Sequence, residues 1–261
     1  MLWCPIWWQH RREKFEMIMR NLARGWHGAR CVYGMPPEDE NPVACYGQIW
    51  GTENVLKRAC ELRRPYWHID NGFWRPGRGL PYGYYRFTYQ GMSARFLPDC
   101  PPDRFERLEI RLRPWRRHGN HILLALPGLE YGCGIGLDMP YWIEETERAL
   151  RKATDRTIIV RPRNSKVPLA RDLNNCWAVV THSSNVAVDA VIAGIPVFVS
   201  PLSMAAPVGN LDFRDLEYAK RPERMEWCRS LAYQQFTVTE MRNGTAYRLL
   251  KRVEDAAHAT H

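Results

Sequence analysis

Short apolar runs alternate with amphipathic stretches through the second half of the chain. Runs that begin at His121, Thr157, Trp177 and Pro196 have the length and β-branched content of buried strands. The stretches between them have helical spacing over Met139 to Thr154, Leu169 to Asn174 and Val186 to Ala193. This order of strand and helix predicts a parallel sheet with helices on both faces.

The first half alternates less regularly. A helix is predicted from His10 to Arg24, because Phe15, Ile18, Met19 and Leu22 fall on one of its faces. A second helix is predicted over Thr52 to Leu62, and strands are predicted over Cys31 to Gly34, Val43 to Gly47, Tyr66 to Asp70 and Tyr84 to Tyr89.

Prolines and arginines gather between the two halves, from Pro98 to Arg117. Because exposed Pro-rich segments often join domains, we expect lobes over 1–100 and 121–255, with a connector over 101–120. The length of 261 residues suits two modest lobes. Ala256 to His261 is expected to be a frayed tail.

Composition and charge narrow the class of protein. No apolar run is long enough to span a bilayer, and the short apolar start is a poor signal peptide because basic residues follow it. The eight cysteines have no zinc spacing, so buried, reduced thiols such as Cys45 and Cys176 in a cytoplasmic protein are expected. No metal site is predicted.

The net charge of +9 indicates an anionic partner. Six arginines surround Trp115 in the connector, and they are Arg104, Arg107, Arg111, Arg113, Arg116 and Arg117. Two interpretations remain open: a solvated connector, or a surface that follows a phosphate backbone.

The stretch from Thr181 to Val199 carries the most specific pattern. It predicts a strand tip, a polar turn, a short helix ended by Gly194 and Pro196, and another buried strand. Ser183 and Ser184 are placed to cap that helix, whose free N–H groups would face an anion. The alternative is that the serines only cap the helix and His182 only packs.

These segments resemble the C-terminal lobe of GT-B glycosyltransferases, especially capsule-type Kdo transferases and phage-borne relatives. The resemblance covers roughly residues 121 to 250 and rests on Arg161-Pro162-Arg163, on Thr181 to Asn185 and on Asp189 to Val197. Glu226 to Ala246 and Tyr66 to Trp74 also resemble family segments. Asp189 stands where the family often has glutamate, and Arg161 and Arg163 stand where it often has lysine and histidine.

The resemblance implies two Rossmann-like lobes with a cleft between them, the first for the acceptor and the second for a nucleotide sugar. It implies a metal-independent transfer of sugar to a hydroxyl without a cofactor. Residues expected to bind the donor are Arg161, Arg163, His182, Ser183, Ser184, Asn185, Asp189 and Gly134 of the glycine-rich loop. The alternatives are an ion pair of the arginines with Asp172 or Asp155, and a helix-dipole role for Asp189.

Asp70 is the first candidate for the general base, because it ends an apolar strand of the first lobe. His68 is a weaker candidate on the same face, since side chains alternate along a strand. A turn at Asp70-Asn71-Gly72 is the alternative role of this carboxylate.

The sequence says less about the acceptor than about the donor. The basic charge and the aromatics Trp74, Tyr82, Tyr84, Tyr85 and Phe87 favour a hydroxymethylated base in phage DNA, modified in the host cytoplasm. A capsule or surface glycan near an anionic membrane is the alternative acceptor. A non-catalytic module that binds nucleic acid or sugar phosphate is a further alternative. A connector that lies far from the donor site would weaken the DNA interpretation.

Overall fold

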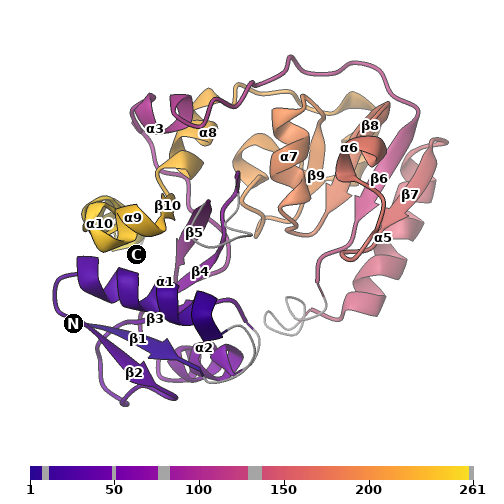
Figure 1. Ribbon diagram of the computed structural model, residues 1–261. Coiled ribbons are helices and arrows are strands. Elements are labelled where there is room, and N and C mark those ends of the chain that lie inside the picture. The colour runs from indigo at the N-terminus through magenta and orange to yellow at the C-terminus, as the bar shows by residue number, and fades with distance from the viewer. Residues whose placement is uncertain (8–11, 49–50, 76–82, 129–136, 259–261) are drawn as a thin grey trace. The chain divides into compact units, whose positions relative to one another are not determined.

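The computed structural model describes residues 1–7, 12–48, 51–75, 83–128 and 137–258. The chain divides into two compact units (Figure 1). Unit 1 comprises Met1–Leu108 and Cys228–His261, and unit 2 comprises Glu109–Trp227.

Unit 1 is built on a six-stranded sheet in the order β10-β5-β4-β3-β1-β2. Strands β1 to β4 are parallel, whereas β5 is antiparallel to both β4 and β10. The strands are β1 (Leu2–Ile6), β2 (Ala29–Tyr33), β3 (Val43–Tyr46), β4 (Tyr66–Asn71), β5 (Tyr84–Tyr89) and β10 (Gln235–Thr237). The helices are α1 (Arg12–Gly25), α2 (Thr52–Glu61), α3 (Asp103–Glu106), α9 (Val238–Arg242) and α10 (Thr245–His258), and α8 (Met225–Ala232) leads in from unit 2.

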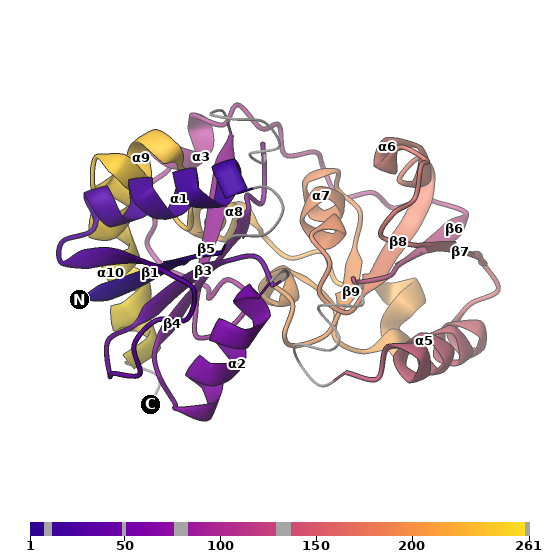
Figure 2. The same ribbon diagram turned by 60° about the horizontal axis from the view of Figure 1, so that its bottom comes forward.

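Helices cover both faces of this sheet (Figure 2). On one face, Ile18 and Leu22 of α1 and Leu250 of α10 pack with Trp67 and Phe87 of the sheet. On the other face, the apolar side of α2 packs against β3. The alternation of side chains along β3 and β4 therefore separates two cores, as the periodicity of a strand requires.

Unit 2 holds a four-stranded parallel sheet in the order β7-β6-β8-β9. Its strands are β6 (His121–Ala125), β7 (Thr157–Arg161), β8 (Cys176–Thr181) and β9 (Val197–Val199). Its helices are α5 (Met139–Ala153), α6 (Leu169–Asp172) and α7 (Val186–Ile192), with the 3₁₀ turns η1 (Ala206–Val208) and η2 (Phe213–Tyr218). The parallel sheet expected from the alternating pattern is present, with every strand of that pattern.

The division into units differs from the expected boundaries at the C-terminal end. Residues 228–255 were expected in the second lobe, but they belong to unit 1. The physical reason is that β10 pairs with β5, which buries Phe236 in the core of unit 1 together with Val253 of α10. The expected connector is also divided, because 101–108, which include α3, belong to unit 1 and 109–120 belong to unit 2. Helix α10 continues to His258, into the segment expected to be frayed.

Candidate functional site

The carboxyl ends of the unit 2 strands lie level with one another. Arg161 of β7 pairs with Ala125 of β6, and Thr181 of β8 pairs with Val199 of β9. Since Leu124 pairs with Val180, Ala125 and Thr181 are at the same height in the sheet. The loops after all four strands therefore leave the sheet at one edge, which we call the carboxyl edge of unit 2.

The crossover connections change direction between β6 and β8. The chain passes from β6 to β7 on one side, whereas it passes from β8 to β9 on the other. Because such connections are right-handed, α5 and α7 lie on opposite faces of the sheet, as Figure 2 shows. Ligands of open α/β sheets bind at this kind of switch point, outside the carboxyl ends of the strands.

The turn after β8 lies at this switch point and is held by its own side chains. Ser184 donates its backbone N–H to Thr181 Oγ1 at 3.3 Å and accepts the N–H of Val186 at 3.3 Å through Oγ. Asn185 precedes the helix without capping it through its side chain. Of the two serines proposed as caps, Ser184 therefore binds the first turn of α7. Asp189 is half-buried one turn further along.

His182 and Ser183 are buried in the same turn, each with 8% of its surface exposed. The His182 Nδ1 atom lies 3.3 Å from Ser183 Oγ, and the imidazole meets the edge of the Trp142 ring of α5 at a centroid distance of 5.8 Å. Burial lowers the pKa of His182, so its imidazole is neutral at pH 7. A neutral imidazole beside a hydroxyl offers hydrogen bonds to a ligand without adding a charge.

Arg161 and Arg163 follow β7 at the same edge. Arg161 forms an ion pair with Asp172 of α6, both side chains being 13% exposed, and donates to the Val167 carbonyl at 2.9 Å. This is the ion pair that the sequence offered as the alternative role of Arg161. Arg163 is exposed on the loop. Gly134, the remaining residue predicted for the donor, lies outside the described residues.

Asp70 and His68 lie on β4 of unit 1, on the face covered by α2. Asp70 Oδ2 accepts a hydrogen bond from Arg86 Nη2 at 2.9 Å, and its Oδ1 accepts the N–H of Asn71 at 2.7 Å. The Asp70 side chain keeps 34% of its surface exposed at the carboxyl end of the strand. Its position fits a proton acceptor that reaches a substrate, although the contact with Asn71 also fits the turn interpretation.

His68 lies deeper, with 3% of its surface exposed. Burial is the main cause that lowers its pKa to about 4, and the neighbouring charge of Arg86 acts in the same direction. The Nδ1 atom of His68 has no hydrogen-bond partner among the described residues. A neutral imidazole covered in this way does not reach a substrate, so Asp70 is the stronger candidate of the two.

Two cations beside β4, Lys14 and Arg86, were not predicted from the sequence. Lys14 Nζ donates to Asn71 Oδ1 at 3.2 Å and lies 5.2 Å and 5.3 Å from the ring centroids of Tyr46 and Tyr85. A cation in the first turn of a helix opposes the helix dipole, and this was the available signal. Arg86 stands opposite Asp70 in the antiparallel ladder, and that pairing cannot be read from the sequence.

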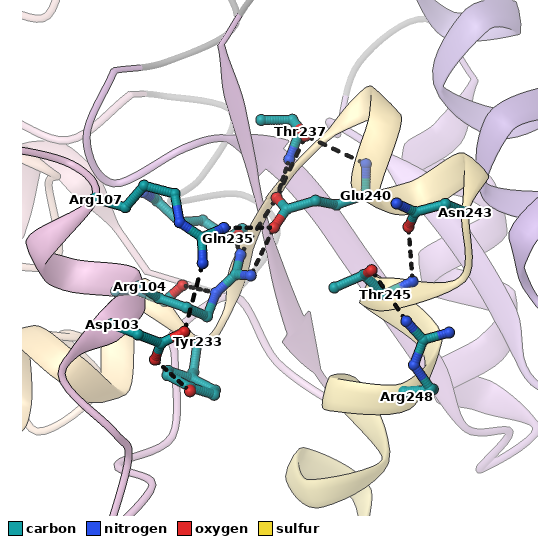
Figure 3. A network of polar contacts seen from close by, with 11 residues as sticks. Asp103, Arg104, Arg107, Tyr233, Gln235, Thr237, Glu240, Asn243, Thr245 and Arg248 are labelled. Atoms are coloured by element: carbon teal, nitrogen blue, oxygen red, sulfur yellow. Dashed lines mark hydrogen bonds and ion pairs between the residues drawn. The ribbon is translucent and has the colours of Figure 1, made fainter.

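Arg104 is not part of a nucleic-acid surface. Its side chain is 6% exposed inside unit 1, where it forms an ion pair with Glu240 at 2.6 Å and donates to the carbonyls of Ala232 and Gln235 at 2.9 and 2.7 Å. Figure 3 shows this guanidinium directed at the Glu240 carboxylate, with the more exposed Arg107 beside it. The aromatics Trp74, Tyr85 and Phe87 are likewise buried, and Tyr82 lies outside the described residues.

Arg111, Arg113, Arg116 and Arg117 belong to unit 2, and their segment lies at the end of the sheet opposite the carboxyl edge. Arg113 N–H donates to the Ile192 carbonyl, and Arg116 donates through Nη1 to the carbonyl of Cys176, the first residue of β8. This segment therefore runs along the starts of β8 and β9. The length of five strand residues, roughly 17 Å, separates it from the loops of the carboxyl edge.

Two functional elements are absent from the described part of the chain. No group of three or more His, Cys, Asp or Glu side chains there is arranged to hold a metal ion. None of its helices is long and apolar enough to cross a membrane.

Comparison with known proteins gave a result at the level of the fold. No family model matches the sequence, and no curated protein matches it. Among solved structures, the chain is similar to Thermosulfurimonas dismutans KpsC, beta Kdo 2,4 transferase, with a TM-score of 0.55 at 16% identity over 95% of this chain and 98% of that one. It is also similar to the beta Kdo 2,7 transferase of KpsC from the same organism, with a TM-score of 0.53 at 12% identity over 95% and 99% of the chains. The expected α/β fold with two Rossmann-like lobes is thus confirmed, and it is the fold of these Kdo transferases.

Proposed function

We propose that the chain is a glycosyltransferase that moves a sugar from a nucleotide sugar to a saccharide hydroxyl. The observation that carries this proposal is the polar turn at the switch point of unit 2. There, the buried His182 and Ser183 and the nearby Asp189 stand at the edge where α/β sheets bind ligands. The fold, which similar structures named as Kdo transferases share, supports the same function.

The reaction assigns a separate task to each unit. The bond between the anomeric carbon and the phosphate oxygen breaks, and the leaving phosphate keeps the electron pair. Ser183 and the exposed Arg163 would stabilise that negative charge through hydrogen bonds and charge. The acceptor oxygen bonds to the anomeric carbon and transfers its proton to the Asp70 carboxylate. Arg161 would position the loop after β7 through Asp172.

A saccharide acceptor agrees better with the positions of the arginines than a DNA base does. In the sequence, six arginines and a group of aromatic residues favoured a DNA acceptor. Arg104 is buried, and Arg113 and Arg116 lie on the segment at the opposite end of the sheet from the switch point. DNA bound there would be about one strand length from the proposed donor site. The names of the similar structures favour Kdo as the first sugar to test.

The experiment is a donor and acceptor screen read by mass spectrometry. The protein is incubated in EDTA with a panel of nucleotide sugars that includes activated Kdo, and with acidic oligosaccharides, neutral oligosaccharides or hydroxymethylated DNA. A sugar-sized mass gain on an oligosaccharide supports the proposal. A gain on DNA alone would replace the acceptor class. Binding of donors without turnover would favour the non-catalytic module.

Variants connect the activity to the site. Asp70→Asn should abolish transfer and retain donor binding, whereas Ser183→Ala should weaken the donor complex or slow the release of phosphate. Asp215→Asn is the matched control, because Asp215 is an exposed carboxylate on η2. Full activity of Asp70→Asn would exclude this residue as the base.

A further inference from the structure

The segment from Glu109 to Asn120 is fixed along the amino ends of the unit 2 strands. Arg113 N–H donates to the Ile192 carbonyl at 3.0 Å, and Arg116 N–H donates to the Gly194 carbonyl at 2.6 Å. Gly194 has a φ of +76°, and a Cβ atom there would clash with the Pro114 carbonyl oxygen. The segment is therefore a defined part of the surface of unit 2 that the proposed transfer site does not use.

Several of its side chains turn inward and use carbonyl oxygens as partners. Trp115 Nε1 donates to the Pro222 carbonyl at 2.9 Å, and the Arg224 guanidinium lies 3.9 Å from a Trp115 ring centroid. Arg116 donates to two carbonyls of unit 2, and Arg221 Nε donates to the Arg116 carbonyl at 2.9 Å. Carbonyl partners satisfy the donors of a guanidinium but leave its positive charge in place.

Other basic side chains of the same region point to solvent. Arg111, Arg113, Arg117 and Lys220 are exposed. Burial is the main cause that lowers the pKa of Arg221, and the charge of Arg117 acts in the same direction. The contact between Arg221 and Arg116 brings the segment that contains Lys220 beside the segment that contains Arg117.

Two acidic groups are close in sequence to these cations. Glu217 is bound by Arg156 at 2.8 Å. Glu223 accepts the backbone N–H groups of Arg224 and Met225 at 2.7 Å, which leaves its negative charge in place, so it offsets one of the cations. Tyr218, three residues before Arg221, is 86% exposed. A tyrosine with an apolar ring and a polar hydroxyl suits the boundary between water and lipid.

We propose that this basic surface, formed by Arg111, Arg113, Arg117, Lys220 and Tyr218, docks the protein on an anionic lipid membrane. Guanidinium groups bind lipid phosphates in a bidentate way, and each basic residue near an anionic membrane adds to the attraction. Binding of single-stranded nucleic acid uses a series of stacked rings, whereas this surface exposes one phenol ring beside its cations. The surface lies away from the proposed transfer site and does not depend on it.

The test measures the binding of the 261-residue protein to vesicles. Phosphatidylcholine vesicles are compared with vesicles that also contain phosphatidylglycerol, at low and at high salt. The wild-type protein should bind the anionic vesicles and dissociate as salt rises. Each arginine should contribute about fivefold, so the triple variant Arg111→Gln, Arg113→Gln, Arg117→Gln should bind roughly a hundredfold more weakly.

The matched control removes the same number of charges from α5, through Arg148→Gln, Arg151→Gln and Lys152→Gln. These residues are exposed, and the two arginines pair with glutamates of their own helix. The control should bind like the wild-type protein. A similar loss in both variants, or equal binding to neutral vesicles, would overturn the proposal. A single-stranded oligonucleotide is the third probe. If the wild-type protein binds the oligonucleotide but not the vesicles, and the triple variant loses that binding, the surface would be assigned to nucleic acid instead. Transfer to a soluble saccharide should be unchanged in the triple variant, which separates this result from the test of the proposed function.

Discussion

The buried guanidinium of Arg104 gives the sharpest prediction, because the sequence favoured a surface role for this residue. Its Nη1 lies 2.6 Å from Glu240, and its Nε and Nη2 donate to carbonyls at 2.9 and 2.7 Å. These bonds connect α3 to the segment that carries β10 and α9. Replacing Arg104 by methionine keeps a long apolar side chain but removes every one of these bonds.

The magnitude follows from what the substitution leaves behind. Two carbonyl groups lose their partner, and the Glu240 carboxylate, which is 14% exposed, loses its nearest cation. Removing one member of a buried pair costs about 3 to 5 kcal/mol. The lower half of that range is expected, because Glu240 keeps the Thr237 N–H at 2.9 Å and has Arg107 Nη1 at 3.9 Å. The corresponding fall in melting temperature is roughly 6 to 16 °C.

The assay is urea and thermal unfolding followed by tryptophan fluorescence and circular dichroism. Arg107→Met is the matched control, since Arg107 is 59% exposed and its removal should cost less than about 1 kcal/mol. Vesicle binding by both folded variants should remain as in the wild-type protein. A destabilisation by Arg104→Met of less than about 1 kcal/mol would refute the argument that this guanidinium holds unit 1 together.

Three further predictions concern stability. The pKa of His68 is lowered from 6.5 to about 4, so below pH 6.5 the unfolded state binds a proton that the folded state does not. The free energy of unfolding should therefore fall by roughly 3 kcal/mol between pH 6.5 and 4. His68→Asn should flatten that part of the curve of stability against pH, and an unchanged curve would contradict the lowered pKa of His68. Gly194→Ala should destabilise the protein by more than about 2 kcal/mol in urea unfolding, because a Cβ atom would clash with the Pro114 carbonyl. The control is Gly34→Ala, since Gly34 has a φ of +82° and no atom within 4 Å of such a Cβ, and it should cost only about 1 to 2 kcal/mol of backbone strain. Equal losses would show that the clash at Gly194 does not affect stability. Thr237→Ala removes a helix cap that Glu240 shares and should cost about 1 kcal/mol by the same assay; a value near zero would show that Glu240 compensates.

The local pattern of the sequence predicted unit 2 well, because its elements follow one another along the chain. Each strand of the sheet is a short apolar run, and each crossover helix lies between two of them. Strand β10 could not be found in this way. It has three residues, and their partners in β5 lie about 150 positions earlier in the sequence. Such pairing depends on tertiary contacts that a local stretch of sequence does not contain. For this reason the sequence placed 228–255 in the second lobe, whereas they belong to unit 1.

The same limit applies to the candidate site. The polar turn after β8 could be located because a strand end and a helix start are local features. Whether Arg161 faces a ligand or a carboxylate depends on α6, which begins eight residues later, and its ion pair with Asp172 occupies part of the guanidinium. Lys14 of α1 and Arg86 of β5 place two cations beside β4. Neither contact leaves a motif in the sequence.

The net charge of the chain indicates a partner only when the cations that are bound inside the fold are left out of the count. Among the arginines between 104 and 117, Arg104 closes a buried network in unit 1, and Arg116 holds the backbone of unit 2 through carbonyls. Their side chains are committed to the fold, so they are not available to follow a phosphate chain. The exposed Arg111, Arg113 and Arg117 lie at the amino ends of the unit 2 strands, while the polar turn of His182 lies at the carboxyl ends. One sheet therefore separates the basic surface from the proposed ligand site. We infer that the charge serves to hold the protein near an anionic surface, and that the chemistry takes place at the other end.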